Sequence, residues 1–84
     1  MYYTYLLFSF KFHKTYIGST SNLEGRLSAH NHPANKGYTK RYQPWEIIYF
    51  EKYTSKSEAI KREIYFKTGS GRDFLKKFIP DFKM

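Results

Sequence analysis

Five side chains of this sequence carry the chemistry that cleavage of a phosphodiester would need, namely Tyr5, Tyr16, Arg26, His30 and Glu63. A single carboxylate can hold a hard divalent cation such as Mg²⁺ that keeps most of its waters. A guanidinium clamps a phosphate with a planar fork of donors, and a phenol beside an imidazole can relay a proton to or from water. The same groups would also bind a phosphate without cutting it.

Each of these residues has a structural explanation when it is taken alone. Tyrosines in strands, as expected for Tyr5 and Tyr16, are most often core residues or cross-strand pairs, and a lone helix histidine is usually structural. Arg26 and Glu63 could form a buried ion pair, which would add little stability because desolvation offsets the Coulombic gain. The functional interpretation rests on all five groups being aimed at one side of a small basic domain.

The two tyrosines stand on segments that predict an antiparallel hairpin. Residues 2–8 are rich in aromatic and aliphatic side chains, and residues 14–19 alternate polar with apolar, as a half-buried strand does. In such a hairpin Tyr5 and Tyr16 share one face. Gly18 leaves no side chain above its position, so another group can approach the backbone there.

A helix is predicted from the Ser-x-x-Glu capping box of Ser21 and Glu24 to about Asn31, ahead of a proline. At helical periodicity, the stripe that should face the sheet combines two leucines with a guanidinium and an imidazole: Leu23, Arg26, Leu27 and His30. Burying a charge without a partner is costly, so Arg26 on this stripe requires an anionic group to meet.

The longest irregular stretch covers residues 32–44 and interleaves cations with two tyrosines, Tyr38 and Tyr42. The cations are Lys36, Lys40 and Arg41. This composition fits a mobile loop that grips phosphate and stacks on bases. A solvated loop that merely crosses the surface is the alternative.

Residues 45–53 predict a third strand, whose near-continuous apolar middle indicates a central position covered on both faces. Trp45 at its start is most simply a packing residue. Ser55 and Glu58 then form a second capping box, which opens a helix.

This second helix is predicted from about Lys56 to Lys67, and its apolar arc contains Ala59, Ile60, Ile64 and Phe66. Glu63 projects near the middle of that arc, with Lys67 close by. A carboxylate on the core-facing side calls for a cation, a metal or an expanse of water. A third helix follows and carries Arg72 on its basic side.

The composition predicts one small folded domain, residues 1–84, with a strong positive charge. Hydrophobic residues make up 40% and aromatic residues 21%, which excludes a disordered chain. The formal net charge is +8, and residues 36–84 carry twelve of the fifteen basic groups. Such a charge attracts phosphate polyanions, so we expect nucleic acid as the partner. A basic surface that serves only solubility is the alternative, and the uneven spread argues against it.

Other classes of protein are disfavoured. The absence of cysteine excludes a disulfide framework and a thiolate zinc site. The apolar run at the N-terminus lacks the charged lead-in of a signal peptide, and no stretch approaches the ~20 apolar residues that span a bilayer. We therefore expect a cytoplasmic protein without a membrane partner.

In order and combination these motifs resemble those of the GIY-YIG nucleases. YTY at residues 3–5 stands where the first motif falls, and YIG at residues 16–18 reproduces the second letter for letter. Residues 23–31 look like the family's helix, with its arginine and, one turn later, its histidine. Residues 59–63 resemble the stretch that supplies the glutamate. The resemblance runs from about residue 2 to residue 78 and is closest to the small stand-alone bacterial members.

The resemblance implies an α+β fold, in which a three-stranded antiparallel sheet is flanked by three helices in the order β-β-α-β-α-α. It also implies DNA cleavage that depends on Mg²⁺ or Mn²⁺. Tyr5 would be the general base for the attacking water, and Tyr16 would position water or phosphate. Arg26 would stabilise the transition state, His30 would assist proton transfer, and Glu63 would be the only protein ligand of the metal.

We therefore expect an endonuclease of low sequence specificity that acts on duplex, nicked, branched or single-stranded DNA, in repair or recombination. The cations expected at the nucleic acid are Lys36, Lys40, Arg41, Lys67 and Arg72. Two alternatives stay open: a non-catalytic binding module that has kept the fold, and a nuclease that cuts only when another protein presents the DNA. Glu63 favours catalysis, because a carboxylate repels phosphate unless a cation intervenes.

Overall fold

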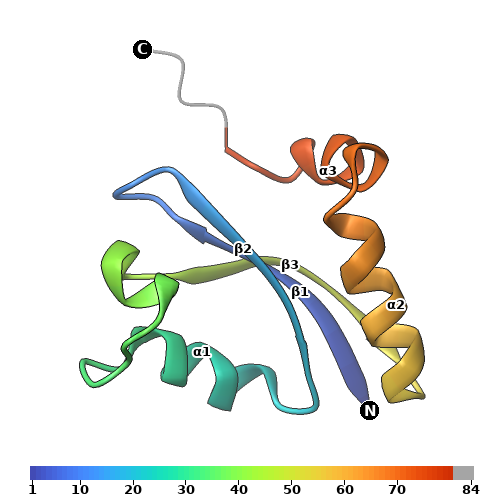
Figure 1. Ribbon diagram of the computed structural model, residues 1–84, viewed down its shortest axis with the longest axis horizontal. Helices are drawn as coiled ribbons and strands as arrows, with labels where there is room; N and C mark the ends of the chain where they lie inside the picture. The colour runs from blue at the N-terminus through green and yellow to red at the C-terminus, as the bar shows by residue number, and fades with distance from the viewer. Residues whose placement is uncertain (81–84) are drawn as a thin grey trace.

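The computed structural model describes residues 1–80 and has the predicted order of strands and helices (Figure 1). The elements are β1 (Tyr2–Ser9), β2 (Lys14–Thr20), α1 (Leu23–Asn31), the 3₁₀ helix η1 (Tyr38–Tyr42), β3 (Glu46–Tyr53), α2 (Lys56–Phe66) and α3 (Gly69–Lys76). The three strands form one antiparallel sheet. The predicted α+β fold is confirmed. The prediction of a single domain over residues 1–84 stays a prediction, and its last four residues lie outside the described part.

The sheet has the order β2-β1-β3, so β1 is the central strand. The prediction that the third strand is central was wrong, because β1 carries an equally continuous apolar run and pairs with both neighbours. Six consecutive residues of β1 are buried, whereas no residue of β3 is, and Phe50 in β3 is 47% exposed. A strand that is covered on both faces has a nearly continuous apolar sequence, and in this sheet that strand is β1.

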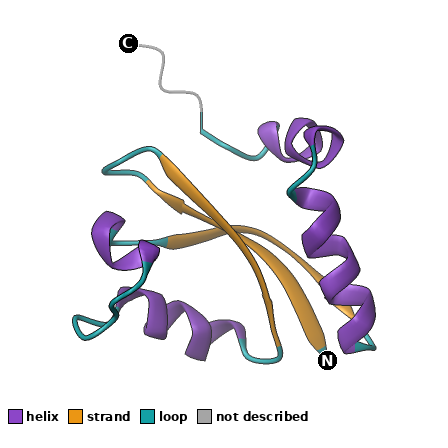
Figure 2. Ribbon diagram, in the orientation of Figure 1, coloured by secondary structure: helices purple, strands orange, loops and turns teal. Residues whose placement is uncertain are grey.

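Helix α1 covers one face of the sheet, and helices α2 and α3 cover the other (Figure 2). Alternate residues of β1 therefore supply two separate hydrophobic clusters. On the α1 face Tyr5 and Leu7 pack with Trp45, which confirms the packing role predicted for the tryptophan. On the α2 face Leu6 packs with three buried residues, Ile17, Phe66 and Leu75.

Two of the predicted helix starts differ in outcome. Ser55 caps α2 as predicted, since its hydroxyl accepts a hydrogen bond from the backbone N–H of Glu58 at 3.2 Å. For α1 the predicted cap, Ser21, was wrong by one residue. The side chain of Asn22 accepts from the backbone N–H of Gly25 at 3.0 Å and takes the N-cap position. Asparagine is as good an N-cap as serine, so the local pattern alone does not choose between them.

The inner face of α2 also differs from the predicted apolar arc. Ala59 and Phe66 are buried, but Ile60 and Ile64 are 37% and 62% exposed. The helix is rotated so that the charged residues Arg62 and Glu63 lie on the same stripe as Ala59 and Phe66. These four residues follow the helical spacing i, i+3, i+4 and i+7. Strong polar contacts from these two residues to the strands fix this rotation, as described below.

Residues 32–44 are more ordered than predicted, because they contain η1 and are tied to α1. The side-chain amide of Asn31 donates to the carbonyl of Trp45 at 3.0 Å and its oxygen accepts from the Trp45 N–H at 2.7 Å. The amide of Gln43 donates to the backbone carbonyls of His30 and His32, at the end of α1. This segment is therefore built onto the helix. Within residues 1–80 no helix has the length and apolar character needed to cross a membrane.

Candidate active site

The phenol of Tyr5 lies over the backbone of Gly18 in the neighbouring strand. Tyr5 and Gly18 are direct partners in the β1–β2 register, and Tyr16 pairs with Leu7 two positions further on. A methyl group added at Gly18 would stand 2.5 Å from the Tyr5 oxygen, so only glycine leaves room for this ring. The rings of Tyr5 and Tyr16 lie 6.4 Å apart. The predicted shared face of the two tyrosines is confirmed.

His30, in the last turn of α1, connects the phenol of Tyr5 to the following loop. Its Nε2 lies 3.1 Å from the Tyr5 oxygen, and its Nδ1 lies 2.9 Å from the Thr39 hydroxyl of η1. The ring of Tyr16 lies 4.8 Å from the imidazole. Burial and the positive charge of Arg26 lower the pKa of His30 below its usual value, so the imidazole is neutral at pH 7.

Arg26 lies beside this pair and is exposed to solvent. It lines a pocket together with Tyr16, His30, Tyr38 and Thr39. The predicted inward stripe of α1 is therefore only partly correct, because the leucines and His30 pack on the sheet while the guanidinium reaches the pocket. Burial raises the pKa of Tyr5 to about 12, against the opposing effect of Arg26. The phenol is therefore protonated at neutral pH.

Glu63 reaches the same region from α2, on the other face of the sheet. Its Oε1 accepts a hydrogen bond from the Ser19 hydroxyl of β2 at 2.8 Å, and its Oε2 lies 3.0 Å from the ammonium of Lys67. The negative charge of Glu63 is one of the causes that raise the pKa of Tyr5. The five predicted residues therefore lie around the edge strand β2, four on the α1 face of the sheet and Glu63 on the α2 face. Figure 1 shows these two helices on opposite sides of the sheet.

The possible metal ligands at this edge are few. Within residues 1–80 no three His, Cys, Asp or Glu side chains gather as they would in a site that encloses a metal. Glu63 pairs with Lys67 there and not with Arg26. One half-buried carboxylate suits a hard cation that keeps most of its waters, and such a cation would have to replace Lys67 at one carboxylate oxygen.

Comparison with known proteins decides the family. The family model of the GIY-YIG catalytic domain matches residues 1–77. The chain belongs to the GIY-YIG nuclease family.

Small bacterial proteins are among the relatives of this GIY-YIG chain. It is 43% identical over 61 residues to UPF0213 protein SH2523 of Staphylococcus haemolyticus, which covers 73% of this chain and 74% of that protein. It is 42% identical over 67 residues to UPF0213 protein CPE1444 of Clostridium perfringens, with coverage of 80% and 71%. For UPF0213 protein YazA of Bacillus subtilis the identity is 40% over 52 residues, or 62% and 52% of the two chains. No solved structure matches.

The five cations expected at the nucleic acid do not form one patch. Lys36 and Arg41 are exposed, and Arg41 lies over the ring of Tyr42, whereas the ammonium of Lys40 donates to the carbonyl of Pro33 in its own loop. Lys67 is paired with Glu63. Arg72 is exposed on α3, which packs on the opposite face of the sheet from α1. Their roles in binding stay predictions.

Two hydroxyl residues that hold the site in this GIY-YIG domain were not predicted. Ser19 fixes one oxygen of Glu63, and Thr39 fixes the inner nitrogen of His30 and also accepts from the Asn35 amide at 2.6 Å. Ser19 directly follows the second motif, which was a usable signal. Thr39 carried none, because its role depends on the turn that η1 makes.

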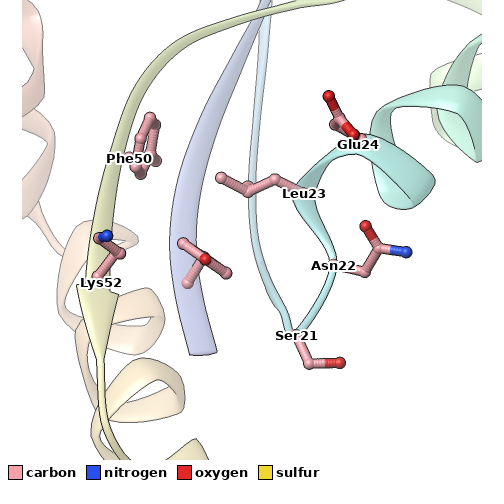
Figure 3. A pocket seen from close by; sticks show the side chains of 7 residues that line it. Ser21, Asn22, Leu23, Glu24, Phe50 and Lys52 are labelled. Atoms are coloured by element: carbon pink, nitrogen blue, oxygen red, sulfur yellow. The ribbon is translucent and has the colours of Figure 1, made fainter. Parts of the chain in front are cut away.

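A second hollow lies beside the site, and none of the five predicted catalytic residues lines it (Figure 3). Phe50 and Lys52 of β3 line one side of it, and the segment from Ser21 to Glu24 lines the other. Phe50 packs edge-on against Tyr3, with ring centroids 6.0 Å apart. Phe50 is the cross-strand partner of Tyr5, but it does not line the pocket that Arg26, His30 and Tyr38 share.

Proposed function

We propose that this GIY-YIG protein is a metal-dependent endonuclease that hydrolyses the phosphodiester bonds of DNA. The observation that carries the proposal is the gathering of a buried phenol–imidazole pair, an exposed guanidinium and a carboxylate at one edge of the sheet. Glu63 favours hydrolysis over a non-catalytic binding module, because a carboxylate repels phosphate unless a cation such as Lys67 or a metal offsets its charge.

Tyr5 and His30 are proposed to take the proton of the attacking water together. Because the Tyr5 phenol is protonated at neutral pH, it can accept a proton only while it gives up its own. The water proton would pass to the Tyr5 oxygen as the Tyr5 proton moves to Nε2 of neutral His30, 3.1 Å away. The hydroxide then forms a new bond to phosphorus as the bond from phosphorus to the leaving oxygen breaks. That oxygen takes up a proton from solvent water, and His30 later returns its extra proton to solvent.

Thr39 supports this transfer by holding the imidazole in place. Nε2 of neutral His30 can accept the Tyr5 proton only when the ring's own proton is on Nδ1, which then donates to the Thr39 hydroxyl at 2.9 Å. When Nε2 takes the second proton, the ring becomes an imidazolium and Nδ1 still donates to Thr39. The imidazole therefore keeps its orientation during the proton transfer.

Arg26 and Tyr16 are proposed to bind the scissile phosphate in the pocket that both line. A guanidinium presents parallel N–H donors to two phosphate oxygens and stabilises the charge that builds up in the transition state. Sequence specificity should be low. Cations contact phosphates and aromatic rings stack on base faces, whereas sequence is recognised through hydrogen bonds to the base edges. A role in repair or recombination belongs to the same proposal.

Glu63 is proposed to hold Mg²⁺ or Mn²⁺ through the oxygen that now faces Lys67. The bound metal would supply Lewis-acid stabilisation of the phosphate charge. Ser19 would keep the other carboxylate oxygen in place, and Lys67 would have to move aside.

A cleavage assay tests the proposal on nicked, forked, single-stranded and duplex DNA, with Mg²⁺, Mn²⁺ or a chelator. We expect Glu63→Gln and Arg26→Lys each to lower the cleavage rate by about 10²-fold or more. Asp73→Asn is the matched control, because Asp73 also pairs with a lysine, Lys76, but lies exposed on α3. Cleavage that survives Glu63→Gln would overturn the proposed site. DNA binding by the wild type without cleavage of any substrate would support the non-catalytic module instead.

A further inference from the structure

A row of aromatic rings leads from the active site to the tip of the β1–β2 hairpin. Tyr16 is followed by Tyr38 at 6.4 Å with nearly parallel planes (27°), Tyr38 by Tyr42 at 5.0 Å, and Tyr42 by Phe12 at 5.6 Å. We call these four residues the aromatic row. Its inner end, Tyr16, contacts His30, and Tyr38 lines the same pocket as Arg26.

Two rings of the row are more exposed than packing requires. Tyr38 is 49% exposed and Phe12 is 40% exposed, although both are large apolar surfaces. Tyr38 also contacts the buried Trp45, with ring centroids 6.3 Å apart, so one side of its ring is supported. Such a ring is a fixed platform with a free surface.

The two chain segments that supply the row carry positive charge only. Residues 10–16 and 35–43, which supply all four rings, contain five Lys or Arg residues and no Asp or Glu. Two of the cations lie over the ring of Tyr42, with the Lys14 ammonium 5.3 Å and the Arg41 guanidinium 5.8 Å from its centre. Rings that alternate with cations suit a polymer that alternates flat apolar faces with phosphates.

We infer that the aromatic row binds unpaired nucleotides next to the scissile phosphate, with Tyr38 as the platform for the first base. A base can stack on a protein ring only when it is not stacked between neighbours in a duplex, so this subsite selects a strand that is unpaired beside the cleavage point. The inference rests on the proposed function for the position of the cut, and it names the substrate class of that site.

The platform is also coupled to the catalytic pair through one turn of chain. Tyr38 and Thr39 are consecutive residues of η1, and the Thr39 hydroxyl contacts His30. A base on Tyr38 therefore presses on the same turn that orients the imidazole. An acidic protein partner would meet the cations equally well, but it would not need the ring of Tyr38, and the experiment separates the two.

The test is binding of fluorescently labelled DNA to the full chain in a chelator, so that neither metal nor cleavage contributes. Tyr38→Leu should weaken binding of single-stranded DNA about 5- to 100-fold, which is the loss expected when stacking of one base is removed. Binding of the matched duplex should stay within about twofold. Phe50→Leu, which removes an equally exposed ring from the second hollow, should change neither, and Tyr38→Trp should restore binding.

A second measurement needs no variant. A 2-aminopurine base is moved along a single-stranded oligonucleotide, and its fluorescence should be quenched most at the position beside the bond that is cut. Equal losses for single strand and duplex in Tyr38→Leu, or a loss of similar size in Phe50→Leu, would overturn the inference. So would uniform quenching along the strand. Cleavage that does not need Tyr38 would overturn the inference about the aromatic row and leave the proposed nuclease function standing. Position-specific stacking without any cleavage would overturn the proposed function and leave the inference standing.

Discussion

At the scale of single residues, the site depends on one missing side chain. Gly18 has an ordinary backbone conformation, so its requirement comes from space alone: the Tyr5 oxygen occupies the place of a methyl group. The phenol is therefore held between the backbone of β2 and the imidazole of His30. Any side chain at position 18 must move the group that we propose to accept the water proton.

Gly18→Ala should consequently lower the cleavage rate by about 10²-fold, the effect of displacing a reacting group by about 1 Å. Cleavage kinetics on the preferred substrate provide the measurement, and circular dichroism checks that the fold persists. Gly69→Ala serves as the control, because no atom lies within 4 Å of a methyl group at that position. Full activity of Gly18→Ala would show that the position of the Tyr5 phenol does not matter.

His30 also predicts a pH dependence of stability. Its pKa is lower in the folded protein than the usual value of 6.5, so the unfolded chain binds more protons as the pH falls below 6.5. Stability should therefore decrease from pH 6.5 downward, by at most about 1.4 kcal/mol per pH unit from this group. Urea unfolding at pH 7.5, 6 and 5 measures it.

In His30→Gln the acid-induced loss of stability should be smaller than in the wild type. His32→Gln, at an exposed histidine two residues further on, should leave the loss unchanged. The opposite ranking of the two variants would mean that burial of the imidazole does not govern the acid response.

At the scale of elements, polar contacts decide how α2 lies on the sheet. Arg62 binds Glu51 of β3 with two nitrogens, at 2.9 and 3.2 Å, while Tyr49 and Tyr53 donate to the same carboxylate. Burial alone would raise the pKa of Glu51, but these hydrogen bonds lower it overall. Because Arg62 and Glu63 are neighbours, this contact to β3 also fixes the direction in which Glu63 points.

Helices α2 and α3 meet closely at another glycine. A methyl group at Gly71 would lie 2.0 Å from the carbonyl oxygen of Tyr65. Because that oxygen belongs to the backbone, relieving the clash would require the two helices to shift. Gly71→Ala should therefore lower the free energy of unfolding by about 1–3 kcal/mol. Gly69→Ala, two residues earlier in open space, should be neutral or slightly stabilising. Urea unfolding followed by the fluorescence of Trp45 compares them, and equal effects would refute the close contact.

The sequence predicted the order of elements because each local signal was strong. Alternation marked the hairpin and the shared face of Tyr5 and Tyr16, whereas the pairing of Tyr5 with Gly18 depends on the turn between the two strands. Pairing between distant segments was not encoded locally, so the apolar runs of β1 and β3 could not be ranked for the central place. The rotation of α2 was missed for a related reason, since Ile60 and Ile64 satisfy apolar periodicity while the Arg62–Glu51 contact opposes it.

The residues of the candidate site also divide into those that the sequence could predict and those that it could not. Groups whose chemistry is unusual for their position, such as Glu63 on an inner helix face, could be selected from the sequence. Ser19 and Thr39 could not, because a hydroxyl is common in strands and loops, and its partner is known only from the fold. Motif spacing thus finds the candidate reacting groups and misses the residues that contact and orient them.

At the scale of the whole molecule, the basic residues behind the charge of +8 lie on both faces of the sheet, and only those near the pocket are expected to contribute to DNA binding. Arg41 lies beside the aromatic row on the α1 side, and Arg72 lies on α3 behind the sheet. If DNA lies against the pocket, Arg41→Gln should reduce the slope of log K against log salt by about 1, and Arg72→Gln should leave it unchanged. Titrations of binding between about 50 and 200 mM salt measure both. A reduced slope for Arg72→Gln alone would place the DNA on the other face.

The division of the site between the two faces has a consequence for how the protein is made. Four of the proposed groups lie between residues 5 and 30, while Glu63 comes from α2, late in the chain. A ribosome releases the chain from its N-terminus, so the four groups of the α1 face are synthesised before the carboxylate that we propose to hold the metal. On that proposal, hydrolysis must await the packing of Phe66 and Leu75 on β1, which brings Glu63 to Ser19. An unfinished chain that lacks α2 is then expected not to cut nucleic acid.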